Sequence, residues 1–212
     1  TTTEISKTIR FQPTFGNETL ILNKKYPIDK TDSVEINLLR FYISTIAFYN
    51  NNQLVHKVEN SYHLIDMLEP STLDILLKGV DNQRFNKVKF NLGIDSLTNV
   101  SGAFGGDLDP TKGMYWTWQS GYINFKLEGK SNLCPTRNQR FQYHLGGYQA
   151  PFYPLQTVEL PIQSKSKMVI YLDIQPFVKE VDLANEYSIM SSSEEAVRLS
   201  KIAAKGFRND EK

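Results

Sequence analysis

One run of strand-forming residues constrains the fold of this chain more than any other feature: INLLRFYISTIAFY, at residues 36–49. β-Branched and aromatic side chains dominate the run, and these residue types favour strands. The three asparagines that follow it, at 50–52, are typical turn residues. We therefore predict a long strand that forms the first half of a hairpin, with its return at residues 54–56.

Shorter strand signals follow along the rest of the chain. In residues 121–128, Ile123, Phe125 and Leu127 alternate with more polar side chains, as in an antiparallel strand that is buried on one face. Short strands joined by polar turns, without a regular alternation of strands and helices, favour an all-β fold, an antiparallel β-sandwich. The other strands are expected at residues 61–66, 73–77, 84–92, 140–145, 157–160 and 167–173.

Helix signals gather near the C-terminus. Ser192 and Glu195 have the spacing of a capping box, an amphipathic run follows them, and Gly206 is a typical stop. A second short helix is expected within residues 177–186. We predict that the last helix packs on the sandwich rather than binding a partner.

We expect a single domain over residues 1–212, with a β core at about 8–175 and a helical tail at 176–212. The chain has 24 basic and 23 acidic side chains, and its net charge of +1 gives no electrostatic footprint for nucleic acid or an anionic membrane. No apolar run approaches the roughly 20 residues that cross a bilayer, so we expect no transmembrane segment. The single cysteine, Cys134, excludes an intrachain disulfide and cysteine-based metal motifs.

A long glycine-rich segment, residues 93–120, separates two of the predicted strands. Loops of this length within compact domains are usually functional or contain secondary structure of their own. Its Asp107 and Asp109 offer oxygen donors that suit calcium, but the rest of an EF-hand loop is missing. We favour a turn-forming role for both aspartates.

Both tryptophans of the chain, Trp116 and Trp118, lie at the end of this segment. If the strand at 121–128 extends backwards, period two puts both indoles on the face opposite to its apolar side chains. If instead the Asp-Pro pair at 109–110 starts a short helix that ends at Gly121, the indoles diverge and one is buried. The sequence leaves both arrangements open.

Three histidines are present, and none belongs to a paired metal motif. His63 and His144 lie within predicted strands, so the fold could bring their imidazoles together. Two imidazoles without a cysteine suit copper or zinc, and Met114 is a candidate soft ligand. The chain has no nucleophile elbow, P-loop or dinucleotide motif, so we do not expect an enzyme.

Six segments of the chain follow the pattern of a known family. They are RFYIS (40–44), YHLID (62–66), FNLGIDS (90–96), VSGAFGGDLDP (100–110), GMYWTWQSGYINFKLEG (113–129) and FQYHLGGY (141–148). Together they resemble the MbnP-like family of methanobactin-associated, copper-binding, secreted bacterial proteins, in the form common in Bacteroidetes. The segment with both tryptophans is the most specific, and the resemblance runs from about residue 11 to the C-terminal helix.

The resemblance implies an exported, copper-binding β-sandwich protein. In this family a partner dihaem enzyme of the cytochrome c peroxidase type oxidises a tryptophan to kynurenine, which helps histidine nitrogens to bind the metal. Carried over, Trp116 or Trp118 is the oxidised residue, and His63 and His144 are the copper ligands. Residues 106–110 lack the histidine of copper-binding members. Because the chain begins without Met or a leader peptide, we expect a removed signal peptide and a periplasmic or extracellular location.

A second interpretation needs no metal. Aromatic side chains near the tryptophans would form a surface that contacts a glycan or a protein, and histidines lying far apart beside such a surface would favour it. A calcium-stabilised sandwich that uses Asp107 and Asp109 ranks third. The aromatic side chains are Tyr115, Trp116, Trp118, Tyr122 and Tyr148.

Overall fold

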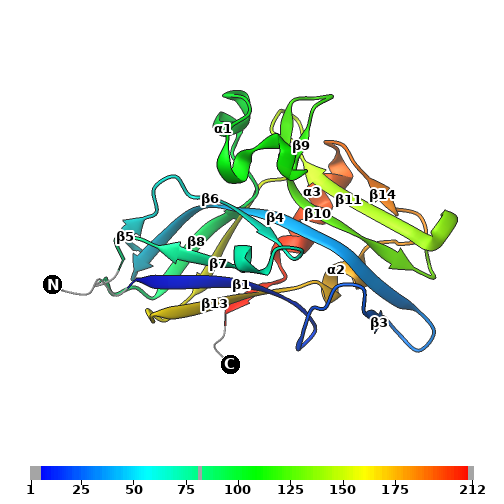
Figure 1. The fold of residues 1–212 in the computed structure, drawn as a ribbon, viewed down its shortest axis with the longest axis horizontal. Coiled ribbons are helices and arrows are strands. Elements are labelled where there is room, and N and C mark those ends of the chain that lie inside the picture. The colour runs from blue at the N-terminus through cyan, green and yellow to red at the C-terminus, as the bar shows by residue number, and fades with distance from the viewer. Residues whose placement is uncertain (1–5, 81–82, 210–212) are drawn as a thin grey trace.

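The larger of two β-sheets is built on one long strand, β4 (Ser33–Asn50), as Figure 1 shows. The computed structural model describes residues 6–80 and 83–209. β10 (Gly121–Ser131) and β8 (Lys87–Leu92) pair in succession along one edge of β4. Three shorter strands pair along its other edge: β3 (Lys25–Pro27), β6 (Tyr62–Asp66) and β5 (Gln53–Lys57).

β10 and β8 extend the larger sheet away from β4. β11 (Arg140–Gly146) pairs antiparallel with β10, and β14 (Ser188–Ile189) pairs parallel with β11. β12 (Gln156–Pro161) pairs with β8, and β9 (Tyr115–Trp116) pairs with the start of β10. The long strand, its hairpin return and the other predicted strands of this sheet are therefore confirmed, with ends shifted by a few residues.

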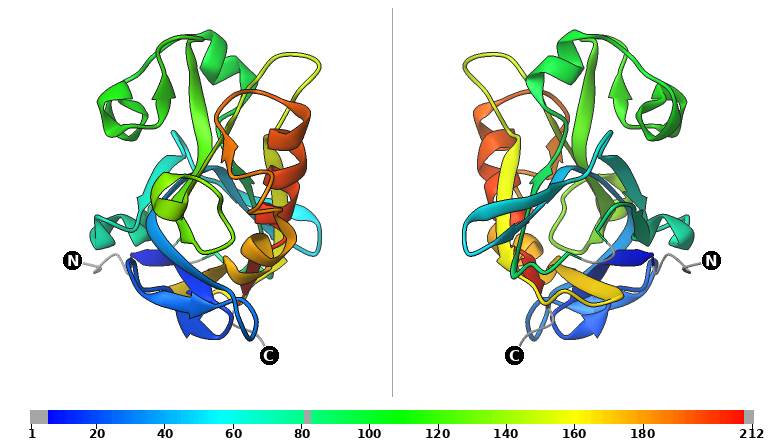
Figure 2. Two further views of the ribbon diagram at one scale, coloured as in Figure 1. Left: turned by 90° about the vertical axis from the view of Figure 1, so that its right-hand side faces the viewer. Right: turned by 90° about the vertical axis from the view of Figure 1, so that its left-hand side faces the viewer.

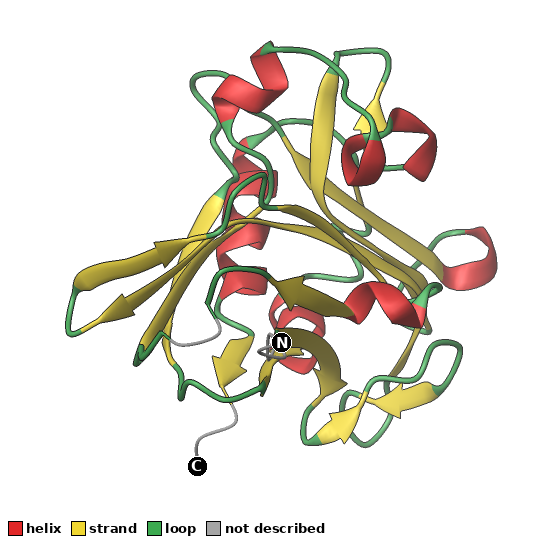
Figure 3. Ribbon diagram, turned by 60° about the vertical axis from the view of Figure 1, so that its left-hand side comes forward, coloured by secondary structure: helices red, strands yellow, loops and turns green. Residues whose placement is uncertain are grey.

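A smaller sheet covers one face of the larger sheet (Figure 3). β1 (Lys7–Phe15), which was not predicted, pairs parallel with β13 (Lys167–Asp173). β7 (Asp74–Leu77), β2 (Glu18–Thr19) and β15 (Phe207–Asn209) pair antiparallel with these two strands. The fold is the predicted all-β sandwich, and the β1–β13 and β11–β14 pairs depart from purely antiparallel pairing.

The main hydrophobic core lies between the two sheets. Phe207 of β15 packs edge to face against Phe11 of β1 and Phe90 of β8, with ring centroids 6.3 Å and 5.1 Å away. Phe41 of β4 approaches the same ring at 6.2 Å. Edge-to-face pairs add to the stabilisation that burial alone provides. Strands from the beginning, the middle and the end of the chain thus close one core.

Two short helices of the C-terminal tail pack on this core: α2 (Gln175–Glu180) and α3 (Glu194–Ala204). This confirms the predicted packing of the last helix. Its cap lies one residue later than predicted, because Ser193, and not Ser192, has the extended backbone of a cap and accepts a hydrogen bond from the Ala196 N–H at 3.1 Å. The tail also contributes β14 and β15, so it is not only helical. In the described part of the chain, no helix is long and apolar enough to span a membrane.

Replacing Phe207 tests whether the C-terminal strand belongs to the core. Phe207→Ala removes a ring that is 6% exposed, so we expect the free energy of unfolding, measured by urea denaturation, to fall by about 3–5 kcal/mol. Leu76→Ala, at a side chain that is 54% exposed on β7, is the control and should change it by less than about 0.5 kcal/mol. Equally small effects of the two substitutions would contradict this packing.

Candidate functional site

Residues 93–120 fold into a lobe on the outer face of the larger sheet, drawn in green at the top of Figure 2. The Asp95 carboxylate accepts a hydrogen bond from the Thr98 N–H at 2.8 Å and caps the first helix of this lobe. The elements of the lobe are α1 (Ser96–Val100), the 3₁₀ turns η2 (Gly106–Leu108) and η3 (Pro110–Lys112), and β9.

The lobe encloses a second hydrophobic core, separate from the main one. Tyr42 of β4 and Tyr122 of β10 pack edge to face within it, with ring centroids 5.9 Å apart. Their hydroxyls donate hydrogen bonds to the carbonyl oxygens of Asp107 and Leu108, each at 2.6 Å. Burial raises the pKa of both phenols, so both stay neutral donors. The other members of this core are Leu64, Ile94, Leu108, Met114, Trp116 and Ile123.

The two tryptophans lie in different environments. Trp116 of β9 is 5% exposed in the second core, whereas Trp118 in the following turn is 65% exposed, with 5.7 Å between the ring centroids. β9 ends at Trp116, and Ser120 has a left-handed φ of 48°, so the turn takes Trp118 out of the strand alternation. The prediction that both indoles share one face is wrong.

The alternative prediction, a short helix started by the Asp-Pro pair, is confirmed in part. The Asp109 carboxylate accepts a hydrogen bond from the Thr111 N–H at 2.9 Å and caps η3, which begins at Pro110. This helix is a single turn that ends at Gly113, with φ 80°, and not at Gly121. The indoles diverge as this alternative expected, and one of them is buried.

A bulge in β10 changes the predicted faces of that strand. Its register against β11 shifts between Ile123 and Phe125. Phe125 and Leu127 face the main core as predicted, while Ile123 and Tyr122 both belong to the second core. Tyr122, expected on the polar face, is therefore buried at 1% exposure.

Asp107 and Asp109 of the lobe accept hydrogen bonds from backbone N–H groups. The Asp107 carboxylate accepts a hydrogen bond from the Leu64 N–H of β6 at 3.0 Å, and Asp109 caps η3. The backbone N–H of Thr111 lowers the pKa of the Asp109 carboxyl. The contact of Asp109 is that of a turn-forming aspartate, as predicted, whereas Asp107 joins the lobe to β6. Within residues 6–80 and 83–209, no group of three or more His, Cys, Asp and Glu side chains is placed to hold a metal ion.

His63 lies half-buried on β6, where it alternates with Leu64 and shares the inner face of the sheet with Ile65. Its Nε2 lies 3.0 Å from the hydroxyl of Ser61. Burial lowers the pKa of the imidazole, which favours the neutral ring. His63 is thus a hydrogen-bonded side chain of the sheet edge.

His144 lies on β11, and its side chain is 10% exposed on the outer face of the sheet. Its Nε2 is 3.7 Å from Oε2 of Glu128 and has no hydrogen-bond partner among the described residues. The imidazole is the main cause of a lowered pKa at Glu128, and Lys126 adds to it. A buried ring nitrogen without a hydrogen bond therefore stands beside an ionised carboxylate.

The two histidines do not converge. They occupy opposite faces of the larger sheet, and their strands are separated by β4 and β10. At about 4.8 Å per strand and 3.3 Å per residue, the pairing registers put their Cα atoms about 17 Å apart. Met114 is completely buried in the second core. His63, His144 and Met114 therefore do not surround one point. The aromatic surface of the second interpretation is not formed either, because Trp116 and Tyr122 are buried.

His144 lies near Trp116 instead. Gly146 is on the same face of β11, two residues and about 7 Å further along the strand. A Cβ at Gly146 would stand 3.1 Å from the ring of Trp116, so the missing side chain lets the indole pack directly on β11. Of the predicted site residues, the structure thus brings together one histidine and one tryptophan.

A group of charged side chains lies beneath the lobe, and no sequence motif indicated it. Arg40, Lys126 and His144 oppose one another across β4, β10 and β11. The Arg40 guanidinium donates to the Asp66 carboxylate at 2.9 Å, and the Lys126 ammonium donates to the Gly113 carbonyl at 2.9 Å. Burial lowers the pKa of Lys126. Only strand pairing places these residues together, so hydrophobic alternation alone does not reveal them.

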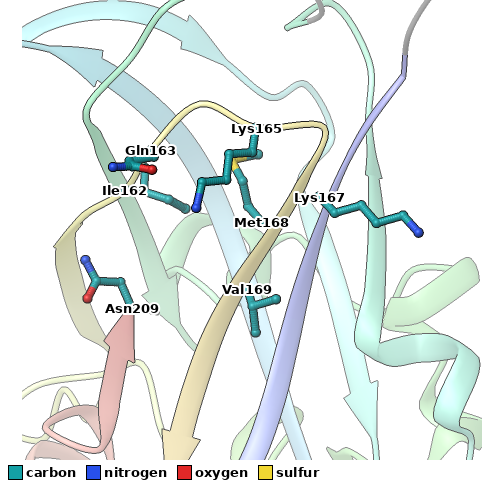
Figure 4. Close-up of a pocket in the computed structure, with 7 residues that line it drawn as sticks. All are labelled: Ile162, Gln163, Lys165, Lys167, Met168, Val169 and Asn209. Atoms are coloured by element: carbon teal, nitrogen blue, oxygen red, sulfur yellow. The ribbon is translucent and has the colours of Figure 1, made fainter. Parts of the chain in front are cut away.

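Three cavities differ in size and chemistry. The one in Figure 4, beside Met168 of β13, holds about 30 Å³, space for little more than a water molecule. One of about 90 Å³ adjoins Trp116 and has no charged side chain in its wall. Another, of about 200 Å³ at the base of the lobe, is lined mainly by charged and polar side chains, among them Arg40, Asp66, Asp107 and Lys112.

Removing one hydroxyl tests the second core. The Tyr122 hydroxyl donates to the Leu108 carbonyl and accepts from the Phe104 N–H at 3.1 Å. Tyr122→Phe leaves both partners unpaired, so we expect the free energy of unfolding in urea to fall by about 1–3 kcal/mol. Tyr153→Phe, at a ring that is 53% exposed, should have an effect below about 0.5 kcal/mol. Wild-type stability of Tyr122→Phe would show that these bonds do not hold the lobe.

Comparisons with known proteins agree with this architecture. The MbnP family model matches residues 4–191. The solved structure of MbnP from Methylosinus trichosporium is similar to this fold with a TM-score of 0.60, over 89% of this chain and 81% of that chain. The two sequences are 12% identical, so this likeness concerns the fold alone. No curated protein matches the chain. Because the family model spans most of the sequence, the chain belongs to the MbnP family.

Proposed function

We propose that this protein is an exported, periplasmic or extracellular, copper-associated protein without catalytic activity of its own, in which His144 and Glu128 are copper ligands. Membership of the MbnP family supports the association with copper. One observation carries the choice of ligands: the buried Nε2 of His144 lacks a hydrogen-bond partner among the described residues and lies 3.7 Å from a carboxylate oxygen. Such an atom is costly unless another group satisfies it, and a metal ion would do so.

The chemistry of the two donors suits Cu(II). Imidazole nitrogen together with carboxylate oxygen is a donor set that this ion accepts. The lowered pKa of Glu128 keeps its carboxylate ionised, so the metal need not displace a proton from it. The positive charge of Lys126 would repel a metal cation, but its ammonium group donates a hydrogen bond to the Gly113 carbonyl. Met114, buried in the second core, is not part of this ligand set.

His63 has a structural role in this proposal. Its Nε2 is close to the Ser61 hydroxyl, and the ring lies on the opposite face of the sheet from His144. The Ser61 oxygen also accepts a hydrogen bond from the Ile46 N–H at 3.1 Å. His63 thus joins β6 to β4 through a side-chain network, and it serves as the matched control for His144.

We assign the oxidisable tryptophan of the family to Trp116. Its ring packs on Gly146, two residues from His144 on the same face of β11. A kynurenine at this position would lie on the same face of the sheet as the proposed copper ligands. The ring of Trp118 is 65% exposed and its centroid lies 5.7 Å from that of Trp116. A partner dihaem enzyme of the cytochrome c peroxidase type would approach Trp116 through this exposed ring.

Copper affinity distinguishes the two histidines. In equilibrium dialysis against Cu(II) with metal analysis, we expect His144→Ala and Glu128→Gln each to weaken binding by at least about tenfold, because each removes a ligand. His63→Ala should bind as the wild type does. Loss of copper in His63→Ala together with full binding in His144→Ala would reverse the assignment, and absence of binding in the wild type would contradict the function.

Intact mass spectrometry tests the modification. Oxidation of tryptophan to kynurenine by the partner enzyme opens the pyrrole ring, releases its C2 carbon as formate and leaves a ketone oxygen on Cγ. This net exchange of one carbon for one oxygen adds about 4 Da. In protein from a host that contains the partner enzyme, we expect this increment in the wild type and in Trp118→Phe, and its loss in Trp116→Phe. An increment that persists in Trp116→Phe but disappears in Trp118→Phe would contradict the assignment to Trp116.

A further inference from the structure

We infer that the lobe binds a neutral sugar, with the cavity beside Trp116 as its pocket and the exposed indole of Trp118 as its stacking surface. The site needs neither copper nor an oxidised tryptophan. It lies at the border of the lobe, where β9, the loop after β11 and the segment before α3 meet. The inference rests on the uncharged polar wall of the cavity, on the fixed loops around it and on the exposed ring of Trp118.

The wall of the cavity is polar but uncharged. A charged ligand would lose its hydration without finding an opposite charge, which is unfavourable. Carboxamide and hydroxyl groups each act as both donor and acceptor, and this matches a ligand that is rich in hydroxyl groups. The cavity holds about 90 Å³, room for part of one sugar ring, and its side chains are Trp116, Gln119, Tyr148, Gln149 and Ser192.

The loops around the cavity are held in place before any ligand arrives. The Tyr148 hydroxyl donates to the Ser120 carbonyl at 3.1 Å, and the Ser96 hydroxyl donates to the Tyr148 carbonyl at 3.2 Å. A Cβ at Gly121 would stand 2.9 Å from the ring of Tyr148, so glycine permits the close contact between the two segments. A preformed wall reduces the entropy that binding must otherwise remove.

Trp118 supplies the apolar part of the site. Its ring is 65% exposed and lies 5.7 Å from the ring of Trp116 in the cavity wall. An exposed aromatic ring beside a polar pocket is typical of a binding surface. A pyranose has a face of C–H groups that stacks on an aromatic ring and a rim of hydroxyl groups that hydrogen-bonds to amides. The indole and Gln119 offer these two kinds of contact side by side.

A proline-rich peptide is the main competing ligand, because aromatic grooves also bind polyproline II helices. Such peptides need a groove that follows the chain over several residues. The cavity is short instead, because it holds only about 90 Å³, and two residues of its wall, Gly147 and Ser192, lie in close contact. A compact pocket beside a single exposed ring favours the sugar.

Saturation-transfer NMR with the neutral oligosaccharides cellohexaose, mannohexaose and hexa-N-acetylchitohexaose tests this site. The protein is produced in a host without the partner enzyme and kept in EDTA, so failure here is distinct from failure of the copper proposal. We expect at least one of the three oligosaccharides to bind saturably at up to about 10 mM, a range in which a millimolar Kd is measurable. Trp118→Ala should weaken that binding by at least about tenfold. Gln119→Ala should weaken it as well.

Leu54→Ala, at a side chain that is 53% exposed on β5, is the control and should bind as the wild type does. Trp118 is exposed, so its variant should keep the wild-type thermal unfolding midpoint, which confirms that lost binding reflects a lost contact. Absence of binding by all three oligosaccharides, binding that Trp118→Ala leaves unchanged, or binding of an octaproline peptide in their place would overturn the inference.

Discussion

The alternation of side chains along β4 is the constraint on which the rest of this structure depends. Phe41 and Ile43 face the main core, and Tyr42 between them faces the second core beneath the lobe. Successive residues of a strand point to opposite faces, so one strand can support both cores only if it is apolar on both sides. This requirement explains why the longest run of strand-forming residues in the sequence is nearly continuous rather than alternating.

Tyr42 also determines where the lobe lies. Its hydroxyl donates to the Asp107 carbonyl, while the carboxylate of Asp107 accepts from the Leu64 N–H of the neighbouring strand. Lys126 of β10 binds the Gly113 carbonyl further along the same segment. One stretch of the lobe is thus tied to three adjacent strands. With that stretch fixed, the hairpin of β9 and β10 has only the β11 side of the sheet on which to bury Trp116.

The parts of the fold with a local signal could be predicted, and those that depend on distant pairing could not. The strands and the last helix could be predicted because their apolar side chains recur with periods of two and 3.6 residues, respectively. β1 was missed although Ile9, Phe11 and Phe15 alternate with polar residues, because Pro13 interrupts the run and the pairing of β1 with the distant β13 has no local signal. The grouping of the site residues could not be predicted for the same reason. His63 and His144 each lie in a predicted strand, but the order of the strands separates the two histidines and puts Glu128 beside His144.

The end of β9 separates the environments of Trp116 and Trp118. In a continuing strand, residues two apart would share a face, and both indoles would pack or both would be exposed. Here the strand stops at Trp116, the chain turns through the left-handed Ser120, and Tyr115 pairs with Tyr122. The fold thus buries one indole on β11 and leaves the other in water. Burying a large apolar side chain contributes about 1.5–3 kcal/mol, a stabilisation that the exposed Trp118 gives up. A tryptophan at a polar turn adds little to the fold, so a ligand or partner that contacts the ring is the better explanation for its presence beside an uncharged pocket.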